Sequence, residues 1–283
     1  MGKQGTAIDF DPKLGSQPSQ SAVYRTYRYM QANAAGRFHN PAGDNLAGRL
    51  IVCAGFGTEG AELALASTIA GGAFLGIDSS SEHLKAAVRN GCCDFMVNTL
   101  DESLRVLKNE LRKQTALSVG LLGLASEIFP AMVERGVQPD LIAERLPQRS
   151  EDDVAIPRQS LLQLLERGAW NLDARPIDVA QHAAPIEVVW TTANAADLKR
   201  LDTVALALLP EDDRVRRRWL LQAPGCFHRQ IPLRRVLGLE PEELNRLLSS
   251  FQDEASTGRL QAPASVCWES SNGAEQTVTL QPC

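Results

Sequence analysis

Gly55-Phe56-Gly57-Thr58-Glu59-Gly60 follows the run 49–54, an arginine and five apolar residues, and precedes an alanine- and leucine-rich run, 61–70. This order predicts a buried strand, a tight glycine turn and a helix. In a dinucleotide site the first glycine makes the turn, the second admits a pyrophosphate, and the third lets helix pack on strand. The helix N-terminus adds unpaired N–H groups for the phosphates. The residues expected to bind the cofactor here are Gly55, Phe56, Gly57, Thr58, Glu59 and Gly60.

An acid stands at the distance that such a site requires. The next apolar run, 73–77, predicts a second strand, and it ends on Asp78. In dinucleotide-binding folds an acid about 20 residues beyond the turn holds the ribose hydroxyls. We therefore expect Asp78 to bind the ribose. The alternative is a similar fold whose glycine turn serves packing alone.

The opening pattern recurs farther along the chain. Residues 116–122 read as a strand, Gly123 turns, 125–135 read as a helix, and 140–143 as another strand. Repeated units of this kind predict an α/β fold with a Rossmann-like, doubly wound, mostly parallel sheet. Both glycine turns then lie at one edge of the sheet, where open α/β sheets bind ligands. The expected second-turn contacts are Gly120, Leu121, Gly123 and Leu124.

Three segments are expected from the pattern along the chain. They are an N-terminal arm with a helix (1–47), a Rossmann-like nucleotide-binding domain (48–150), and a C-terminal region (151–283) that forms a small α/β cap. In the last segment we expect a strand at 186–190 and helices at 195–209, 212–221 and 241–252. The chain becomes polar after Gly258, which predicts a loosely ordered tail.

Composition narrows the class of protein. The net charge of −5 argues against nucleic acid as a partner. The six cysteines form no CxxC pair, which fits a reducing compartment. The N-terminus has no apolar leader, and no run is long enough to span a membrane. We therefore expect a soluble, cytoplasmic protein without a membrane partner. The sequence leaves open whether the chain forms a homodimer.

A resemblance to one family rests on several stretches. Residues 48–71 resemble, without gaps, the glycine-rich stretch of urocanases that leads from a strand through the turn into its helix. Residues 118–123, and the positions from Glu127 to Asp140, resemble the family's second glycine turn and the arginine–glycine and proline–aspartate pairs that follow it. Elsewhere in the chain fewer residues match, but the matching stretches occur in the same order as in the family. The chain is thus identified as a shortened, diverged urocanase-like protein covering the Rossmann-like domain and part of the C-terminal region.

The resemblance implies NAD as the cofactor. Urocanases hold NAD+ tightly and use it as an electrophile while water adds to urocanate, with no net hydride transfer. Several matched positions depart from the family. Leu63 and Leu124 replace amide side chains, Glu144-Arg145-Leu146 replaces a histidine-bearing segment, and Val236 replaces the catalytic cysteine. We therefore expect no urocanate hydratase activity.

The candidates for catalysis are few. A competing alignment places Cys267 at the thiol position, and Cys226 lies two residues before His228, where a thiol–imidazole pair is conceivable. Two hypotheses remain. The chain is either an NAD+-dependent lyase or hydratase acting on another small-molecule substrate, or a non-catalytic NAD-binding or interaction protein. An NAD-dependent oxidoreductase is a weaker alternative, because no hydride-transfer motif is visible.

Overall fold

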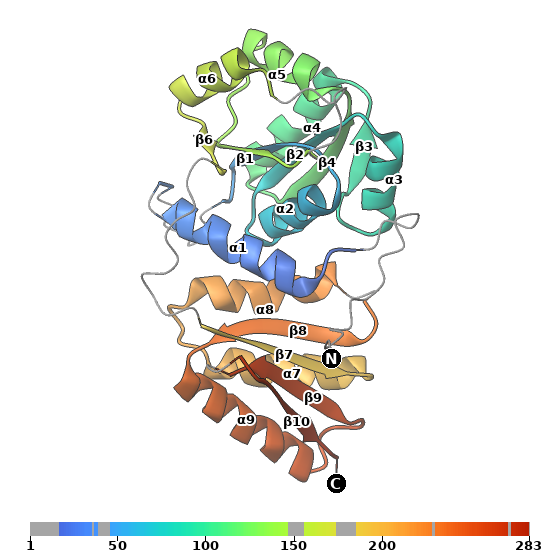
Figure 1. The fold of residues 1–283 in the computed structure, drawn as a ribbon, viewed down its shortest axis with the longest axis vertical. Helices are drawn as coiled ribbons and strands as arrows, with labels where there is room; N and C mark the ends of the chain where they lie inside the picture. Colours follow the sequence, from blue (N-terminus) through green and yellow to red (C-terminus); the bar gives the residue numbers. More distant parts are fainter. Residues whose placement is uncertain are drawn as a thin grey trace, which may run out of the picture. The chain divides into compact units, whose positions relative to one another are not determined.

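The computed structural model describes residues 17–35, 37–38, 46–146, 156–173, 185–227, 230–270 and 273–282. The chain divides into two compact units. The first comprises residues 1–18, 48–68 and 72–173, and the second comprises 19–47, 69–71 and 174–283. Each unit has a sheet of its own, blue to yellow-green in the first and yellow to red in the second (Figure 1).

The first unit is built on a six-stranded sheet in the order β3-β4-β2-β1-β5-β6. Every recorded strand pair in this sheet is parallel, which confirms the expected α/β, Rossmann-like fold. The central strands are buried on both faces, as their unbroken apolar sequences require. The strands are β1 (Leu50–Ala54), β2 (Ala73–Asp78), β3 (Phe95–Val97), β4 (Leu117–Leu122), β5 (Leu141–Glu144) and β6 (Trp170–Asn171).

Helices connect and flank these strands. The side-chain oxygens of Ser80 and Thr99 accept backbone N–H groups at the starts of two of them, as helix-capping residues do. Aliphatic and aromatic side chains of strands and helices form one core, which includes Val52, Leu75 and Phe129. The helices are α2 (Thr58–Ile69), α3 (Ser81–Arg89), α4 (Leu100–Lys113), α5 (Ala125–Glu134) and α6 (Arg158–Glu166).

The strand order reverses at β1. From β1 the chain builds β2, β3 and β4 on one side, and then crosses to place β5 and β6 on the other. Helices that leave neighbouring strands in opposite directions open a crevice between them at the carboxyl edge, and ligands of such folds bind there. The first glycine turn follows β1 and therefore lies at this crevice.

The second unit holds a four-stranded antiparallel sheet in the order β10-β9-β7-β8. Helices α7 and α9 pack against this sheet, and α1 and α8 lie along its edge strand β8 (Figure 1). The ring of Trp219 on α8 packs against the α1 tyrosines Tyr24 and Tyr27. The elements are α1 (Gln20–Ala35), β7 (Ile186–Thr192), α7 (Ala195–Leu208), α8 (Arg214–Cys226), β8 (Leu233–Leu239), α9 (Pro241–Ser256), β9 (Ala264–Glu269) and β10 (Glu275–Leu280).

The expectation of a loosely ordered tail was wrong. The segment after Gly258 forms β9 and β10, and β9 pairs with both β7 and β10. Ala264 and Val266 alternate into the core, and Gly273 turns the hairpin with a φ of 77°. Polar residues dominate only the outer face, as in a sheet with one face buried. The α8 helix also runs farther than the predicted 212–221, because it continues through Pro224.

No helix in the described part of the chain is long and apolar enough to cross a membrane.

Candidate functional site

Both glycine turns meet at the end of β2. The Gly55 N–H donates to the carbonyl oxygen of Ile77 at 2.7 Å, and the Gly123 N–H donates to that of Asp78 at 3.0 Å. The first turn leads into α2 and the second into α5. Both turns therefore lie at one edge of the sheet, as expected, with the acid between them.

The three glycines of the first turn have different surroundings. A Cβ at Gly55, whose φ is 97°, would come within 3 Å of the Arg145 carbonyl. A Cβ at Gly60 would come within 3 Å of the Gly55 carbonyl. Among the described residues, a Cβ at Gly57 would meet nothing within 4 Å. Two glycines are thus needed for packing, and the middle one faces open space.

Asp78 is buried, with 6% of its surface exposed, and is hydrogen-bonded to backbone on both sides. Its Oδ2 accepts the Phe56 N–H of the first turn at 2.7 Å. Its Oδ1 accepts the Ser80 N–H at the start of α3 at 2.8 Å. Each carboxylate oxygen can accept a further hydrogen bond, so the group retains capacity for a ligand. Asp78 therefore both fixes the turn and offers acceptors at the end of β2.

Phe56 does not face the turn's open side. Its ring is buried and packs edge-on against Phe74, with centroids 5.5 Å apart. Gly76 on β2 leaves the room for this ring, because a Cβ there would overlap it. Only the Phe56 backbone therefore serves the site.

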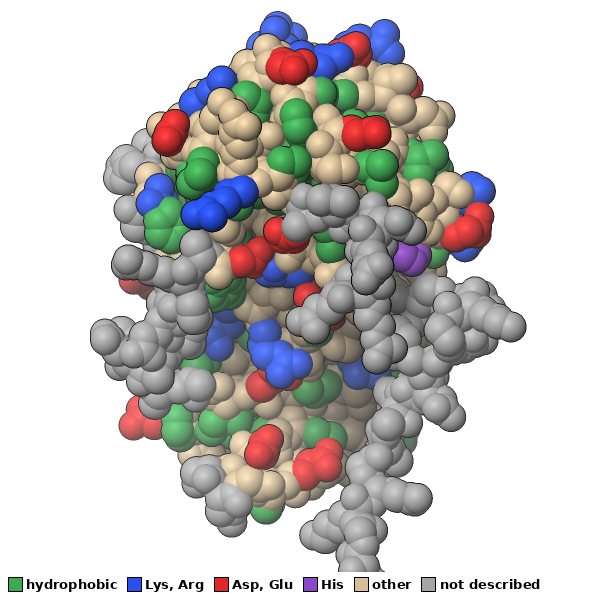
Figure 2. Space-filling model, turned by 45° about the horizontal axis from the view of Figure 1, so that its top comes forward, with side chains coloured by type: hydrophobic (Ala, Val, Ile, Leu, Met, Phe, Trp, Pro, Cys, Tyr) green, Lys and Arg blue, Asp and Glu red, His purple; other side chains and the backbone are tan. Residues whose placement is uncertain are grey.

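His83 is a site residue that the sequence analysis did not identify. Its Nδ1 lies 3.2 Å from both carboxylate oxygens of Asp78, and half of its side chain is exposed. A histidine side chain is visible at the surface in Figure 2 (purple). The sequence did hold one sign of this contact, the capping residue Ser80. A helix that begins at this serine brings its first turn, with His83, close to the end of the preceding strand. Any ligand that binds Asp78 must share the carboxylate with this imidazole.

Arg145 lies beside the first glycine turn, with its carbonyl against Gly55. Its guanidinium pairs with Asp173 and donates to the Glu144 carbonyl at 2.8 Å. Its Nε also lies 3.8 Å from the carboxylate of Glu59, in the first turn of α2. A negative side chain at a helix N-terminus disfavours a bound anion. The arginine partly offsets that charge, and its pairing with Asp173 was not predicted from the sequence.

The remaining predicted cofactor residues fall into two groups. Thr58 and Glu59 are exposed at the start of α2, and Gly123 and Leu124 are partly exposed at the second turn. Leu121 is fully buried in the core, and Gly120 leaves room for Leu84, whose Cδ2 would lie 2.9 Å from a Cβ there.

The two candidate thiols lie on different elements of the second unit. Cys267 is half-buried on β9 and its sulfur accepts the Thr277 hydroxyl at 3.4 Å. Cys226 ends α8, and its suggested partner His228 lies outside the described residues. Burial raises the pKa of the Cys53 thiol, and it raises that of Cys93 to about 12, so both stay protonated. Within the described ranges, no group of three or more His, Cys, Asp or Glu side chains is placed to hold a metal ion.

A family model for the urocanase Rossmann-like domain matches residues 18–159. The chain belongs to the urocanase family. The matched segment contains the parallel sheet up to β5, both glycine turns and Asp78. The urocanase relationship was thus predicted correctly from the sequence, as was the Rossmann-like domain.

Two positions that depart from the urocanase pattern have a clear structural setting. Leu63 is fully buried within α2, and Val236 is fully buried on β8. Neither side chain carries a group that can transfer a proton or accept a hydrogen bond.

Proposed function

We propose that this urocanase-family protein binds NAD at the first glycine turn. The proposal rests on the different surroundings of the three glycines in this turn. Gly55 and Gly60 are closed in by backbone, whereas no described residue comes within 4 Å of a Cβ at Gly57. A pyrophosphate needs such an opening beside the N-terminus of a helix, here that of α2. When bound, the cofactor would supply an electrophilic nicotinamide.

The acid at the end of β2 favours NAD over NADP. Asp78 would accept the ribose hydroxyls, and its negative charge would repel a 2′-phosphate. The nearby Lys85 pairs with Glu82 at 3.0 Å, which leaves it poorly placed to compensate a phosphate. Binding of NAD also requires the His83 imidazole to share or leave the Asp78 carboxylate.

The protein does not hydrate urocanate under this proposal. The aligned thiol position holds Val236, and the segment after β5 has Arg145 engaged with Asp173 and Glu59 instead of a histidine. General acid–base groups contribute about 10²–10⁴-fold each. Loss of several such groups leaves NAD binding without the urocanase reaction, and any chemistry must involve a different substrate.

Two measurements on the purified protein test this function. Absorbance and mass spectra of the small molecules released on denaturation are expected to show NAD. Urocanate absorbance, followed with saturating NAD+, is expected to stay at the level of a no-protein control. Turnover above that control would contradict the loss of hydratase activity, and Cys267→Ala would then show whether Cys267 carries it.

A further inference from the structure

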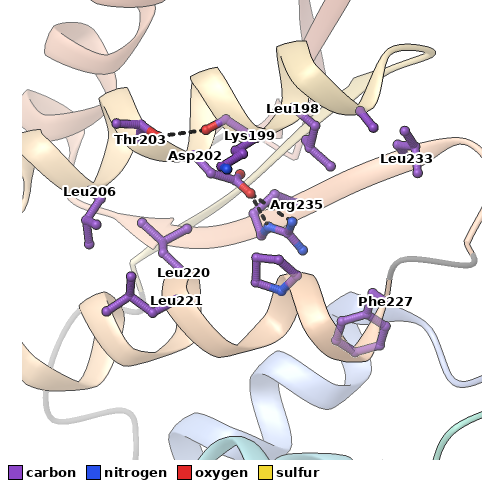
Figure 3. Close-up of a pocket in the computed structure, with 12 residues that line it drawn as sticks. Leu198, Lys199, Asp202, Thr203, Leu206, Leu220, Leu221, Phe227, Leu233 and Arg235 are labelled. Atoms are coloured by element: carbon purple, nitrogen blue, oxygen red, sulfur yellow. Dashed lines mark hydrogen bonds and ion pairs between the residues drawn. The ribbon is translucent and has the colours of Figure 1, made fainter.

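The second unit contains a cavity of about 390 Å³ between α7 and α8. Figure 3 shows the two helices on either side of it and Arg235 of β8 between them. Small-molecule sites span roughly 300–1,000 Å³, so the cavity is large enough for a small ligand. Its walls are mainly apolar, formed by Leu198, Leu206, Leu220, Leu221, Pro224, Phe227 and Leu233.

A buried ion pair lies between these walls. Arg235 is only 3% exposed, and its Nε and Nη2 donate to Oδ2 of Asp202 at 3.0 and 2.8 Å. The other oxygen of Asp202 accepts the indole N–H of Trp190 at 3.1 Å. Both partners are therefore held in place. Burial of a charged pair in an apolar wall is costly, so its presence calls for an explanation beyond stability.

One nitrogen of Arg235 remains unused. Nη1 donates to no acceptor among the described residues, although the side chain is almost fully buried. In Figure 3 this third nitrogen carries no dashed line and lies on the side of α8. Nη1 is not among the side-chain atoms that are shut off from solvent without a partner, so this charged donor opens onto the cavity, where the acceptor of a ligand can reach it.

The charges that line the cavity favour an anion. Asp202 is neutralised by Arg235, whereas Lys199, which also lines the cavity, forms no ion pair within the described part of the chain. The lining therefore carries one uncompensated positive charge beside an unused arginine donor. The apolar walls in turn suit a hydrocarbon body.

We propose that this cavity binds a small aliphatic carboxylate, with the carboxylate on Arg235 and Lys199 and the chain against the leucines. The site lies wholly in the second unit and does not depend on the glycine turn. Binding here is expected whether or not the protein holds NAD.

Matched ligands test the head group. Titration calorimetry of the full chain would compare octanoate, octan-1-ol and octylamine, which share one hydrocarbon chain. Octanoate is expected to bind about tenfold or more tightly than octanol, because a hydrogen bond to a charged group is lost in the alcohol. Octylammonium is expected not to bind. No octanoate binding at millimolar concentration, or octanoate no tighter than octanol, would overturn the proposal.

Variants then locate the site. Leu206→Trp places bulk in the cavity and is expected to abolish octanoate binding. Ala207→Trp is its control, because Ala207 is the next residue on α7 and is exposed outside the cavity lining. The double variant Asp202→Leu/Arg235→Leu removes the pair together and is expected to reduce the preference for octanoate over octanol, with Lys199 still in the lining. Wild-type octanoate affinity in a folded Leu206→Trp protein would place the ligand elsewhere and refute the site. If Leu206→Trp fails to fold, Lys199→Ala takes its place, with weaker octanoate binding and unchanged octanol binding expected.

Discussion

Phe56 donates its backbone N–H to the Asp78 carboxylate at 2.7 Å, so the glycine turn and the acid at the end of β2 form one hydrogen-bonded unit. The acid is thus more than a potential contact for a ribose. It also fixes the conformation of the turn that would receive the pyrophosphate. Substitutions at Asp78 are therefore expected to change stability and cofactor affinity together.

Asp78→Asn tests this double role. An amide has one acceptor oxygen, whereas the carboxylate uses one oxygen for Phe56 and the other for Ser80. One backbone N–H loses its partner, at a cost of about 1–3 kcal/mol in the free energy of unfolding. NAD+ affinity is expected to fall as well, measured by calorimetry beside urea denaturation. The control is Asp94→Asn, which alters a similar contact to the Ser118 N–H away from the turns and leaves affinity unchanged. Full affinity in Asp78→Asn would rule out a ribose contact.

His83→Ala tests whether the imidazole competes with the cofactor for Asp78 or itself contacts the cofactor. The imidazole lies 3.2 Å from both oxygens of Asp78, where ribose hydroxyls would bind. Its removal is expected to strengthen NAD+ binding, because the carboxylate becomes free for the ligand. Lys85→Ala on the same helix, which loses only an exposed pair with Glu82, is expected to change nothing. Weaker binding in His83→Ala would mean that the histidine itself contacts the cofactor.

Glu243→Gln is expected to lower the stability of the second unit in a pH-dependent way. The Arg216 guanidinium donates to both carboxylate oxygens of Glu243, at 2.6 and 2.9 Å, and these hydrogen bonds hold the pKa of the carboxyl below its usual 4.5. A depressed pKa stabilises the fold above the unfolded-state value, and the stabilisation disappears as pH falls through the folded-state value. The variant should therefore unfold more easily than wild type at pH 7, and the difference should disappear as pH falls from 4.5 through the lower folded-state pKa. A difference that persists unchanged in strong acid would contradict this assignment.

Thiol reactivity is expected to follow burial. Cys53 and Cys93 are buried, and burial raises the pKa of both thiols, that of Cys93 to about 12. Iodoacetamide reacts with the thiolate, so both should resist labelling at pH 8 in the native protein. The half-buried Cys226 and Cys267 should label faster. Peptide mapping by mass spectrometry gives the rate at each position, and denatured protein provides the control. Rapid native labelling of Cys53 would contradict the buried β1 strand.

The sequence predicts the first unit well because its signals are local. The buried strands β1 and β4 are each followed at once by a glycine turn and a helix, and the helix predicted at 125–135 is confirmed as α5. The acid at the end of β2 was placed correctly for the same reason. His83 was missed because its contact with Asp78 depends on how α3 begins, which residue spacing alone did not reveal.

The second unit was harder to predict because its sheet joins distant segments. Strand β7 pairs with β8 and β9, which lie far along the chain. Strand β8 was not predicted, since Arg234 and Arg235 interrupt its apolar pattern. Arg235 is buried only because Asp202 on α7 pairs with it. The cavity between α7 and α8 likewise results from helix packing that no local motif encodes.

Calorimetric titration of NAD+ into wild type, Gly57→Val and Gly60→Ala tests the central claim most directly. Wild type is expected to bind NAD+ more tightly than NADP+. Gly57→Val should stay folded yet lose binding, because its side chain fills the open space that would admit the pyrophosphate. Gly60→Ala should instead lose about 1–3 kcal/mol of stability, because its Cβ meets the Gly55 carbonyl. No binding of NAD+ to wild type, or unchanged binding in a folded Gly57→Val protein, would contradict a cofactor site at this turn.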